Sequence, residues 1–210
     1  MKSEDIKSYI NVLKSYDEEE YLYSTIAFST GPTLAREKPS SLLIFNKDNN
    51  HNLKDTWERV KEHIKNRISL KFFELNSTEK STIVLFYNED MLEDVVKSEK
   101  NIKFLSRFNY KKDMNLKQCL NLLKMRFEKS CPHEVGIFLG YPVNDVEMFV
   151  NCPNEKCLMV GYWKVYNDIE NAKNTFKKYD NIKSHIMKLI TKGINPIDII
   201  SCSYYSTAYC

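Results

Sequence analysis

Glycine and proline are scarce in this chain, which has 5 and 6 of them among its 210 residues. So low a content excludes collagen-like and glycine/proline-rich low-complexity classes. No window approaches the ~18 consecutive apolar residues of a membrane-spanning helix. The segment Met1–Ser8 is polar, unlike the basic-then-apolar start of a secretory signal. We therefore expect a cytoplasmic protein that does not bind membranes.

The sequence also lacks a paired-cysteine motif, because its six cysteines include no CxxC. Cysteines in the cytoplasm are expected to be reduced. Cys131, His133, Cys152 and Cys157 have the residue types of a metal site, but their spacing does not match the paired ligands of structural zinc sites. We predict no metal, and no motif identifies a cofactor.

An excess of one charge is missing too: 31 basic residues face 28 acidic ones, for a net charge of +3. Nucleic-acid-binding proteins usually concentrate basic residues in a stripe. Here the pairs Lys111–Lys112 and Lys177–Lys178 stand among acidic residues at helix-like spacing. We therefore expect no nucleic-acid partner, while protein partners and the oligomeric state remain open.

Helical and strand patterns alternate along the chain. Apolar residues three and four apart predict helices over Ser3–Tyr16, Asp17–Phe28, His51–Ile68 and Leu116–Phe127, and in a long segment from Ile169 to Ile190. Short runs rich in β-branched and aromatic residues predict strands at Leu42–Phe45, Leu70–Leu75, Thr82–Tyr87 and Leu158–Tyr166, whereas Val135–Tyr141 fits either a strand or a buried helix.

This mixture, without a long linker or an internal repeat, predicts the fold class. We expect α+β: a single domain over residues 1–200, with a small mixed β-sheet flanked by several helices. Residues 201–210 are expected to form a C-terminal tail.

The segment Ser29–Ser41 contains a glycine and two prolines, which we expect to prevent a continuous helix. It places Lys38, Ser40 and Ser41 just before a predicted strand. An ammonium group, hydroxyls and free backbone N–H groups suit an anionic ligand. The GxxxxGK[ST] spacing of a Walker loop is absent. The alternative is a rigid loop whose hydroxyls bond its own backbone.

Among the polar residues of the sequence, the adjacent pair His133 and Glu134 is the most specific candidate for a functional role. Histidine titrates near neutral pH and suits a general base, with Glu134 as an orienting carboxylate. The alternative is a structural role, in which His133 caps backbone groups and Glu134 forms an ion pair. Cys131 next to His133 also permits a thiol nucleophile, although no oxyanion loop is recognisable.

Aromatic residues gather in the last third of the chain. Tyr141, Tyr162, Lys164 and Tyr166 are candidates to line a flat pocket for a planar ligand such as a flavin or tetrapyrrole. Strand alternation places Tyr162, Lys164 and Tyr166 on one face and Trp163 on the other, in the core. The alternative is ordinary packing, since aromatic residues in strands usually fill cores.

Three blocks of the sequence resemble a known bacterial family. They are PTLAREKPSSLL (32–43), PHEVGIFLGYPVNDVEMFV (132–150) and GYWKVYNDIENA (161–172), and they resemble the signature blocks of the domain of unknown function DUF3793. The chain departs from the family pattern at Arg36–Glu37 and in its Cys202–Cys210 tail. The resemblance implies no activity; through the gene neighbourhoods of such families in anaerobic bacteria, it hints at redox or iron physiology.

Together these features predict a protein that binds an anionic or planar small molecule. Its site gathers the Lys38–Ser41 loop, the pair His133 and Glu134, and the face of Tyr162, Lys164 and Tyr166. Whether it is an enzyme stays open. The alternative is a protein-interaction module without chemistry, and a more distant one is a thiol-dependent hydrolase that uses Cys131 and His133.

Overall fold

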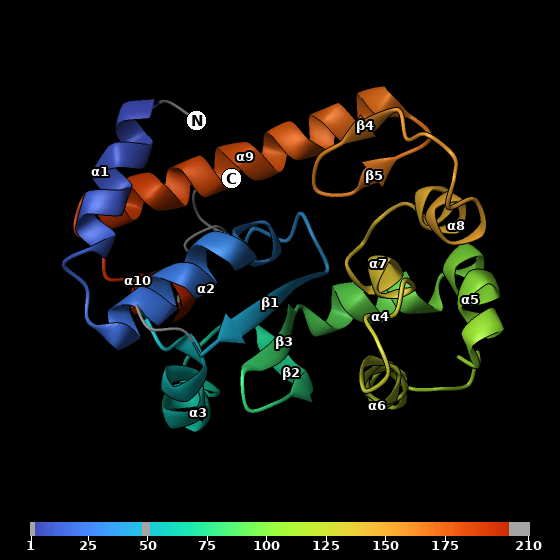
Figure 1. The fold of residues 1–210 in the computed structure, drawn as a ribbon, viewed down its shortest axis with the longest axis horizontal. Helices are drawn as coiled ribbons and strands as arrows, with labels where there is room; N and C mark the ends of the chain where they lie inside the picture. Colours follow the sequence, from blue (N-terminus) through green and yellow to red (C-terminus); the bar gives the residue numbers. More distant parts are fainter. Residues whose placement is uncertain (1–2, 48–50, 202–210) are drawn as a thin grey trace.

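A three-stranded antiparallel sheet lies in the middle of the protein (Figure 1). The computed structural model describes residues 3–47 and 51–201. The strands are β1 (Ser40–Asn46), β2 (Lys71–Ser77) and β3 (Ser81–Tyr87), in the spatial order β1-β3-β2. The α+β class is confirmed, and the tail predicted for 201–210 falls, from residue 202 on, outside the described residues.

The direction of the strand pairing agrees with the connections between the strands. Ser40 pairs with Tyr87 across β1 and β3, while β2 joins β3 through a short turn in which Thr78 N–H donates to the Ser81 carbonyl at 2.8 Å. Strands joined by so short a turn must be antiparallel, because parallel strands need a long crossover. β1 also pairs with β3 in the antiparallel direction, so the sheet is wholly antiparallel, whereas the sequence predicts a mixed sheet.

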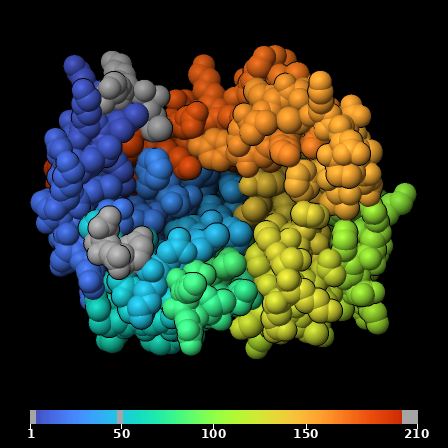
Figure 2. Space-filling model, in the orientation of Figure 1, coloured from blue at the N-terminus to red at the C-terminus, as the bar shows by residue number. Residues whose placement is uncertain are grey.

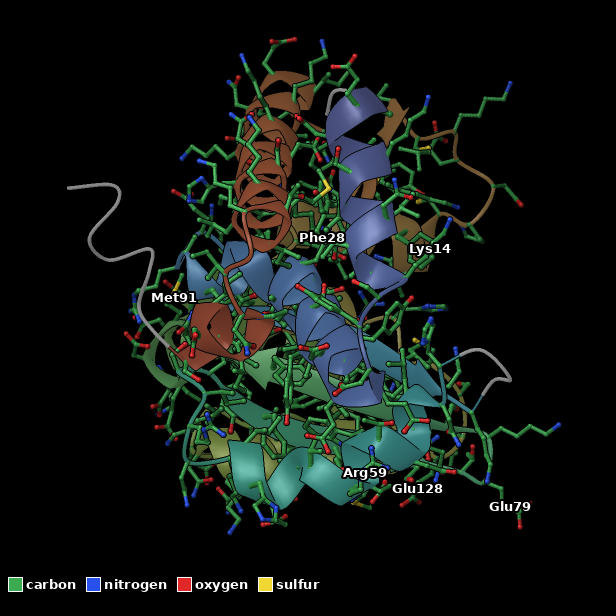
Figure 3. The ribbon with its side chains drawn as sticks, turned by 90° about the vertical axis from the view of Figure 1, so that its left-hand side faces the viewer. Lys14, Phe28, Arg59, Glu79, Met91 and Glu128 are labelled. Atoms are coloured by element: carbon green, nitrogen blue, oxygen red, sulfur yellow. The ribbon has the colours of Figure 1, made fainter. Side chains whose placement is uncertain are left out.

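One face of the sheet forms a first core. Leu43 and Phe45 of β1 and Val84 and Phe86 of β3 are buried there with Trp57. The helices that cover this face are α1 (Ser3–Leu13), α2 (Glu18–Leu34), α3 (Leu53–Ile64), α9 (Ile169–Thr191) and α10 (Pro196–Ser201). Figure 3 shows α1 and α9 side by side with Phe28 of α2 between them.

The opposite face forms a second core around Leu75, Leu85 and Tyr87. The helices on this side are α4 (Glu89–Lys97), α5 (Glu99–Leu105), α6 (Leu116–Phe127), α7 (Val135–Phe138) and α8 (Val143–Asn151), with a 3-10 turn at Ser106–Phe108. Local signals fix some helix starts: Asn115 and Gln118 form a capping box before α6, as Asp17 and Glu20 do before α2.

A two-stranded hairpin, β4 (Met159–Val160) and β5 (Lys164–Val165), packs on the N-terminal half of α9. Trp163, Val165, Ala172 and Tyr179 make a third, small core there. In Figure 2 the orange surface of α8 and the hairpin adjoins the yellow and green surface of the second-core helices. Helix α9 continues from this hairpin to α1 at the other end of the molecule (Figure 1).

Two local predictions need correction. The single strand predicted over Leu158–Tyr166 is the hairpin, whose turn is closed by a hydrogen bond from Gly161 N–H to the Trp163 carbonyl at 3.0 Å. The alternation that placed Tyr162 and Lys164 on one face therefore fails, because the chain reverses between them. The ambiguous run Val135–Tyr141 is helical, as α7, from Val135 to Phe138.

Helix α2 also continues where an end was predicted, because it passes through Gly31 and Pro32. A side chain at Gly31 would place its Cβ 2.5 Å from Ile186 Cδ1, so glycine allows α2 and α9 to approach closely. The proline removes one helical hydrogen bond, but it lies in the last turn of α2, and both residues are buried. Packing outweighs the local helix-breaking tendency here.

Among residues 3–47 and 51–201, no helix combines the length and the apolar character that crossing a membrane requires.

Because β3 contributes side chains to both the first and the second core, we expect the protein to unfold cooperatively. Leu85→Ala removes a fully buried side chain from the second core, so we expect the free energy of unfolding to fall by about 2–5 kcal/mol. Trp57 and Trp163 report on the first and third cores. In each of the Trp57→Phe and Trp163→Phe proteins, the fluorescence of the remaining tryptophan and the circular dichroism should give coincident transitions in denaturant, and Leu85→Ala should shift both signals together. Two separate transitions would contradict the single domain.

Candidate functional site

A cavity of about 430 Å³ opens where the third core meets α7 and α8. Its walls come from the segment 131–136, from Tyr141 and the inner face of α8, and from the hairpin. The residues that line it are Cys131, Pro132, His133, Val135, Gly136, Tyr141, Asp145, Val146, Phe149, Trp163 and Lys164.

The turn between α7 and α8 sets the position of Tyr141. Gly140 has a positive φ of 75°, and a Cβ there would lie 2.6 Å from the Pro39 ring, so only glycine fits. Tyr141 N–H then donates to the Gly136 carbonyl at 2.9 Å. Ser40 ties the same turn to β1, since its hydroxyl donates to the Phe138 carbonyl at 2.7 Å.

Asp145, in the first turn of α8, connects the hairpin to α8 through hydrogen bonds. Its buried carboxylate accepts hydrogen bonds from Trp163 Nε1 at 2.8 Å and from the backbone N–H groups of Tyr166 and Asn167, both at 2.9 Å. The Asn167 side-chain amide donates a fourth bond at 3.1 Å. Hydrogen bonds to a charged acceptor are stronger than neutral ones. This one side chain therefore fixes the tryptophan and the exit of β5.

Aromatic rings form the walls. Tyr141 stacks on Trp163 with ring centroids 5.2 Å apart, and Trp163 meets the edge of Phe176 at 4.5 Å. Trp163 is only 9 % exposed, as predicted for a core residue. Phe149 is 37 % exposed and closes one side of the opening. The interior thus presents flat apolar surfaces.

Two basic side chains border the opening. The His133 ring contacts Phe149 edge-on at 5.1 Å, and Lys164 Nζ lies 5.2 Å from the centroid of the same ring. Within the described part of the chain, neither the imidazole nor this ammonium group forms a hydrogen bond or an ion pair. Both remain available to a ligand.

Lys38 lies beside the cavity, because it contacts Tyr141, which lines the cavity. Its ammonium is 5.5 Å from the centroid of Tyr141, and the residue is 8 % exposed. Burial, reinforced by the charge of Lys183, lowers the pKa of Lys38 to about 8. The hydroxyl groups of Ser40 and Ser41 point elsewhere: Ser40 bonds Phe138, and Ser41 bonds the Thr33 hydroxyl at 2.8 Å.

The predicted pair His133 and Glu134 is divided between two environments. Glu134 is fully buried and accepts two hydrogen bonds from the Arg126 guanidinium, through Nε and, at 3.3 Å, through Nη2. His133 faces the cavity instead. Glu134 therefore has the geometry of the structural alternative, an ion pair that anchors the start of α7 to α6.

The tyrosines of the hairpin also separate. The Tyr162 hydroxyl donates to Asp180 Oδ1 at 2.9 Å, and burial with this carboxylate raises the pKa of Tyr162. Tyr166 meets Asp145 through its backbone only. Neither side chain lines the cavity, whereas Tyr141 and Lys164 do.

Cysteine chemistry has little support at this site. Cys131 is exposed as a whole residue and lines the cavity. Its thiol is nonetheless partly buried, and this burial, together with the negative charge of Glu134, raises the pKa of Cys131. A nucleophilic cysteine needs the opposite shift, because the thiolate is the reactive form. In the described ranges, no group of three or more His, Cys, Asp or Glu side chains is placed to hold a metal ion.

A family model described as "Protein of unknown function (DUF3793)" matches residues 26–200. The chain belongs to the DUF3793 family. Comparison with the curated proteins gave no match, and neither did comparison with the solved structures.

In this DUF3793 protein, two of the three blocks that carry the family resemblance line the cavity, and the first block contacts its wall. The first supplies Lys38 beside Tyr141, the second supplies Tyr141 and Asp145, and the third supplies Trp163 and Lys164. In the sequence, Asp145 follows a proline closely and has only the pattern of an acidic residue near a helix start. Its four donors come from residues 18 to 22 positions away, which no local pattern indicates.

Asp145→Asn is expected to loosen the hairpin of this DUF3793 protein. An amide keeps one acceptor but turns N–H groups towards donors, so we expect a loss of about 1.5–3 kcal/mol in the free energy of unfolding. Hydrogen exchange at the Tyr166 and Asn167 amides should accelerate. Asp168→Asn is the matched control, because it caps α9 at the surface and asparagine caps equally well. Unchanged protection in Asp145→Asn would contradict the assigned role.

The lowered pKa of Lys38 predicts that the free energy of unfolding depends on pH. Its folded pKa of about 8 lies below the usual 10.5, so between these values the unfolded state binds more protons and stability rises with pH. Above pH 10 the buried tyrosines with raised pKa, such as Tyr9 and Tyr141, act in the opposite direction. Lys38→Met should raise the free energy of unfolding near neutral pH by an amount on the order of 3 kcal/mol.

Denaturant titrations between pH 7 and 10 check this expectation. The wild-type protein should gain stability over the range, whereas Lys38→Met should gain much less, with a remainder from Lys183, whose pKa is also lowered by burial. Equal slopes in the two proteins would show that Lys38 is charged and solvated in the folded state.

Proposed function

We propose that the cavity binds a small, planar and mainly apolar molecule that carries an acidic group. One observation carries the proposal: an aromatic-walled cavity has two unpaired basic side chains at its opening. The proposal retains the anionic and planar ligand classes expected from the sequence and joins them in one compound.

The size and walls of the cavity support a flat ligand. Its volume of about 430 Å³ falls within the range of small-molecule sites. The stacked Tyr141 and Trp163 rings offer a face on which another ring can lie, and Phe149 offers an edge. Burial of an apolar ring against these walls supplies the larger part of the binding free energy.

The opening supports an acidic group on that ligand. Lys164 and His133 approach Phe149 from its face and its edge, and both lie at the water-exposed end of the cavity. The one carboxylate in the lining, Asp145, is already held by four donors. A ligand carboxylate at the opening gains a charge-assisted hydrogen bond while its ring is buried.

Calorimetric titration with 2-naphthoate and its neutral amide tests the proposal. We expect the carboxylate to bind about fivefold more tightly than the amide, since a partly exposed charge pair contributes about 1 kcal/mol. Lys164→Met should reduce this preference, with the remainder due to His133, while it leaves the amide bound. Trp163→Leu should weaken both ligands, because it removes the stacking wall.

Val160→Ser is the matched control on the same hairpin, because Val160 is 70 % exposed and lies outside the cavity lining. It should bind both compounds as the wild type does. If neither compound binds at millimolar concentration, or if Lys164→Met keeps the full preference for the carboxylate, the proposal is wrong.

A protein-interaction module without chemistry is the second candidate. Leu158 and Val160, which are 59 % and 70 % exposed, favour it, since large apolar side chains rarely stand together in water without a reason. The titration above separates the two candidates, because these side chains lie outside the cavity. The link to redox or iron physiology and the cytoplasmic location rest on the sequence alone and stay predictions.

A further inference from the structure

The basic residues of the chain are unevenly distributed. Residues 97–129 run from the end of α4 through α5 and the 3-10 turn to just beyond the end of α6. They contain ten basic and three acidic residues, whereas the rest of the chain contains 21 basic and 25 acidic ones. The nearly balanced total therefore conceals a strongly basic segment within an acidic remainder. Such a segment attracts partners of the opposite charge.

Most of these basic side chains are exposed and have no counter-charge. Within residues 3–47 and 51–201, only Lys97 and Arg126 of this segment form ion pairs, with Glu93 and Glu134. The other eight are exposed: Lys100, Lys103, Arg107, Lys111, Lys112, Lys117, Lys124 and Lys129. Exposed charges add little to the stability of a fold, so stability does not account for their concentration here.

A groove lies at the C-terminal end of α6, within this basic segment. Its volume is about 230 Å³, and its lining consists of Leu122, Met125, Arg126, Lys129, Ser130 and Pro132. Met125 is 62 % exposed, while the opposite face of α6 is buried in the second core. Both charged residues of the lining are basic. The groove therefore combines apolar side chains with positive charge.

The groove is separate from the surfaces described above. It shares Pro132 with the cavity of the proposed function, and the two linings have no other residue in common. The exposed hairpin residues Leu158 and Val160 do not line it. A ligand in the cavity and a partner on α6 can therefore be tested independently.

We propose that this groove binds an acidic segment of a partner protein. The segment inserts an apolar side chain beside Leu122, Met125 and Pro132, and it places carboxylates near Lys129 and the other lysines of α6. In protein interfaces, a few side chains that fill pockets supply most of the binding energy. Charges around them set the rate and the selectivity of association. Methionine suits such a groove, because its flexible side chain adapts to the partner.

Nucleic acids and membrane surfaces match the charge but not the groove. No residue of the groove lining is aromatic, whereas single-stranded nucleic acids stack their bases on aromatic side chains. A helix that binds a bilayer inserts its apolar face, and the apolar face of α6 is buried in the second core. An acidic protein segment matches both the charge and the apolar groove.

Two synthetic peptides test the proposal on the full chain. One is rich in glutamate and has leucines at helical spacing, and the other has serine in place of each leucine. The readout is the methyl NMR spectrum of the methionines, in which Met125→Leu identifies the Met125 signal. We expect the leucine peptide to shift this signal and to leave that of Met159, in the hairpin, unchanged. The serine peptide should bind at least about tenfold more weakly, because it leaves the groove unfilled.

Lys129→Glu and Met125→Ser change the groove itself. Each should weaken binding of the leucine peptide, and the charge reversal should do so about tenfold. Both residues are exposed, so we expect both variants to fold. Lys177→Glu is the matched control, because it reverses an exposed charge on α9. Figure 1 shows α9 along the upper side of the molecule and α6 at the lower side, so the affinity should not change.

Several outcomes would overturn the proposal. They are equal binding of the two peptides, no binding of either at millimolar concentration, or equal weakening by Lys177→Glu and Lys129→Glu. Random-sequence duplex DNA and phosphatidylglycerol vesicles are titrated at the same salt concentration. If either shifts the Met125 signal and binds more tightly than the leucine peptide, the surface serves a nucleic acid or a membrane instead.

Discussion

A central strand with two apolar faces is the constraint on which the architecture depends. β1 and β2 both pair with β3, and every side chain of β3 from Ile83 to Tyr87 meets either the first core or the second. Val84 and Phe86 point into one, and Leu85 and Tyr87 into the other. A polar residue on either face would leave an unpaired group in a packed interior. The sheet therefore joins two helical layers that neither local propensity nor short loops would bring together.

Several side chains of the candidate cavity stand in three compact segments that the sequence singles out. His133, Tyr141 and Lys164 line one cavity, and Lys38 contacts Tyr141, whereas Tyr162 and Tyr166 lie outside the lining; that these residues form a binding site stays a prediction. Helices with regular apolar spacing were also predictable, since burial of one face is a local property. Trp163 was placed correctly in the core, although by an alternation that the hairpin does not have.

The remaining features depend on distant partners and leave no local signal. Asp145 looks like any acidic residue in the first turn of a helix, yet its donors belong to the hairpin. Gly31 and Pro32 look like a helix end, yet α2 continues through them, with Gly31 against Ile186 of α9. Lys183 is one of many lysines on a long amphipathic helix, and only its contacts with the Phe28 and Tyr162 rings distinguish it. Each case is decided by tertiary contact.

The length of α9 has a mechanical consequence. Its 23 residues span about 35 Å; the first half carries Phe176 and Tyr179 under the hairpin, and the second buries Ile186 and Ile190 in the first core. An α-helix resists bending, because its backbone hydrogen bonds run along its axis. Any displacement of the hairpin that keeps its contacts with α9 must therefore tilt this helix against α1 and α2, so the two ends of the molecule are mechanically coupled.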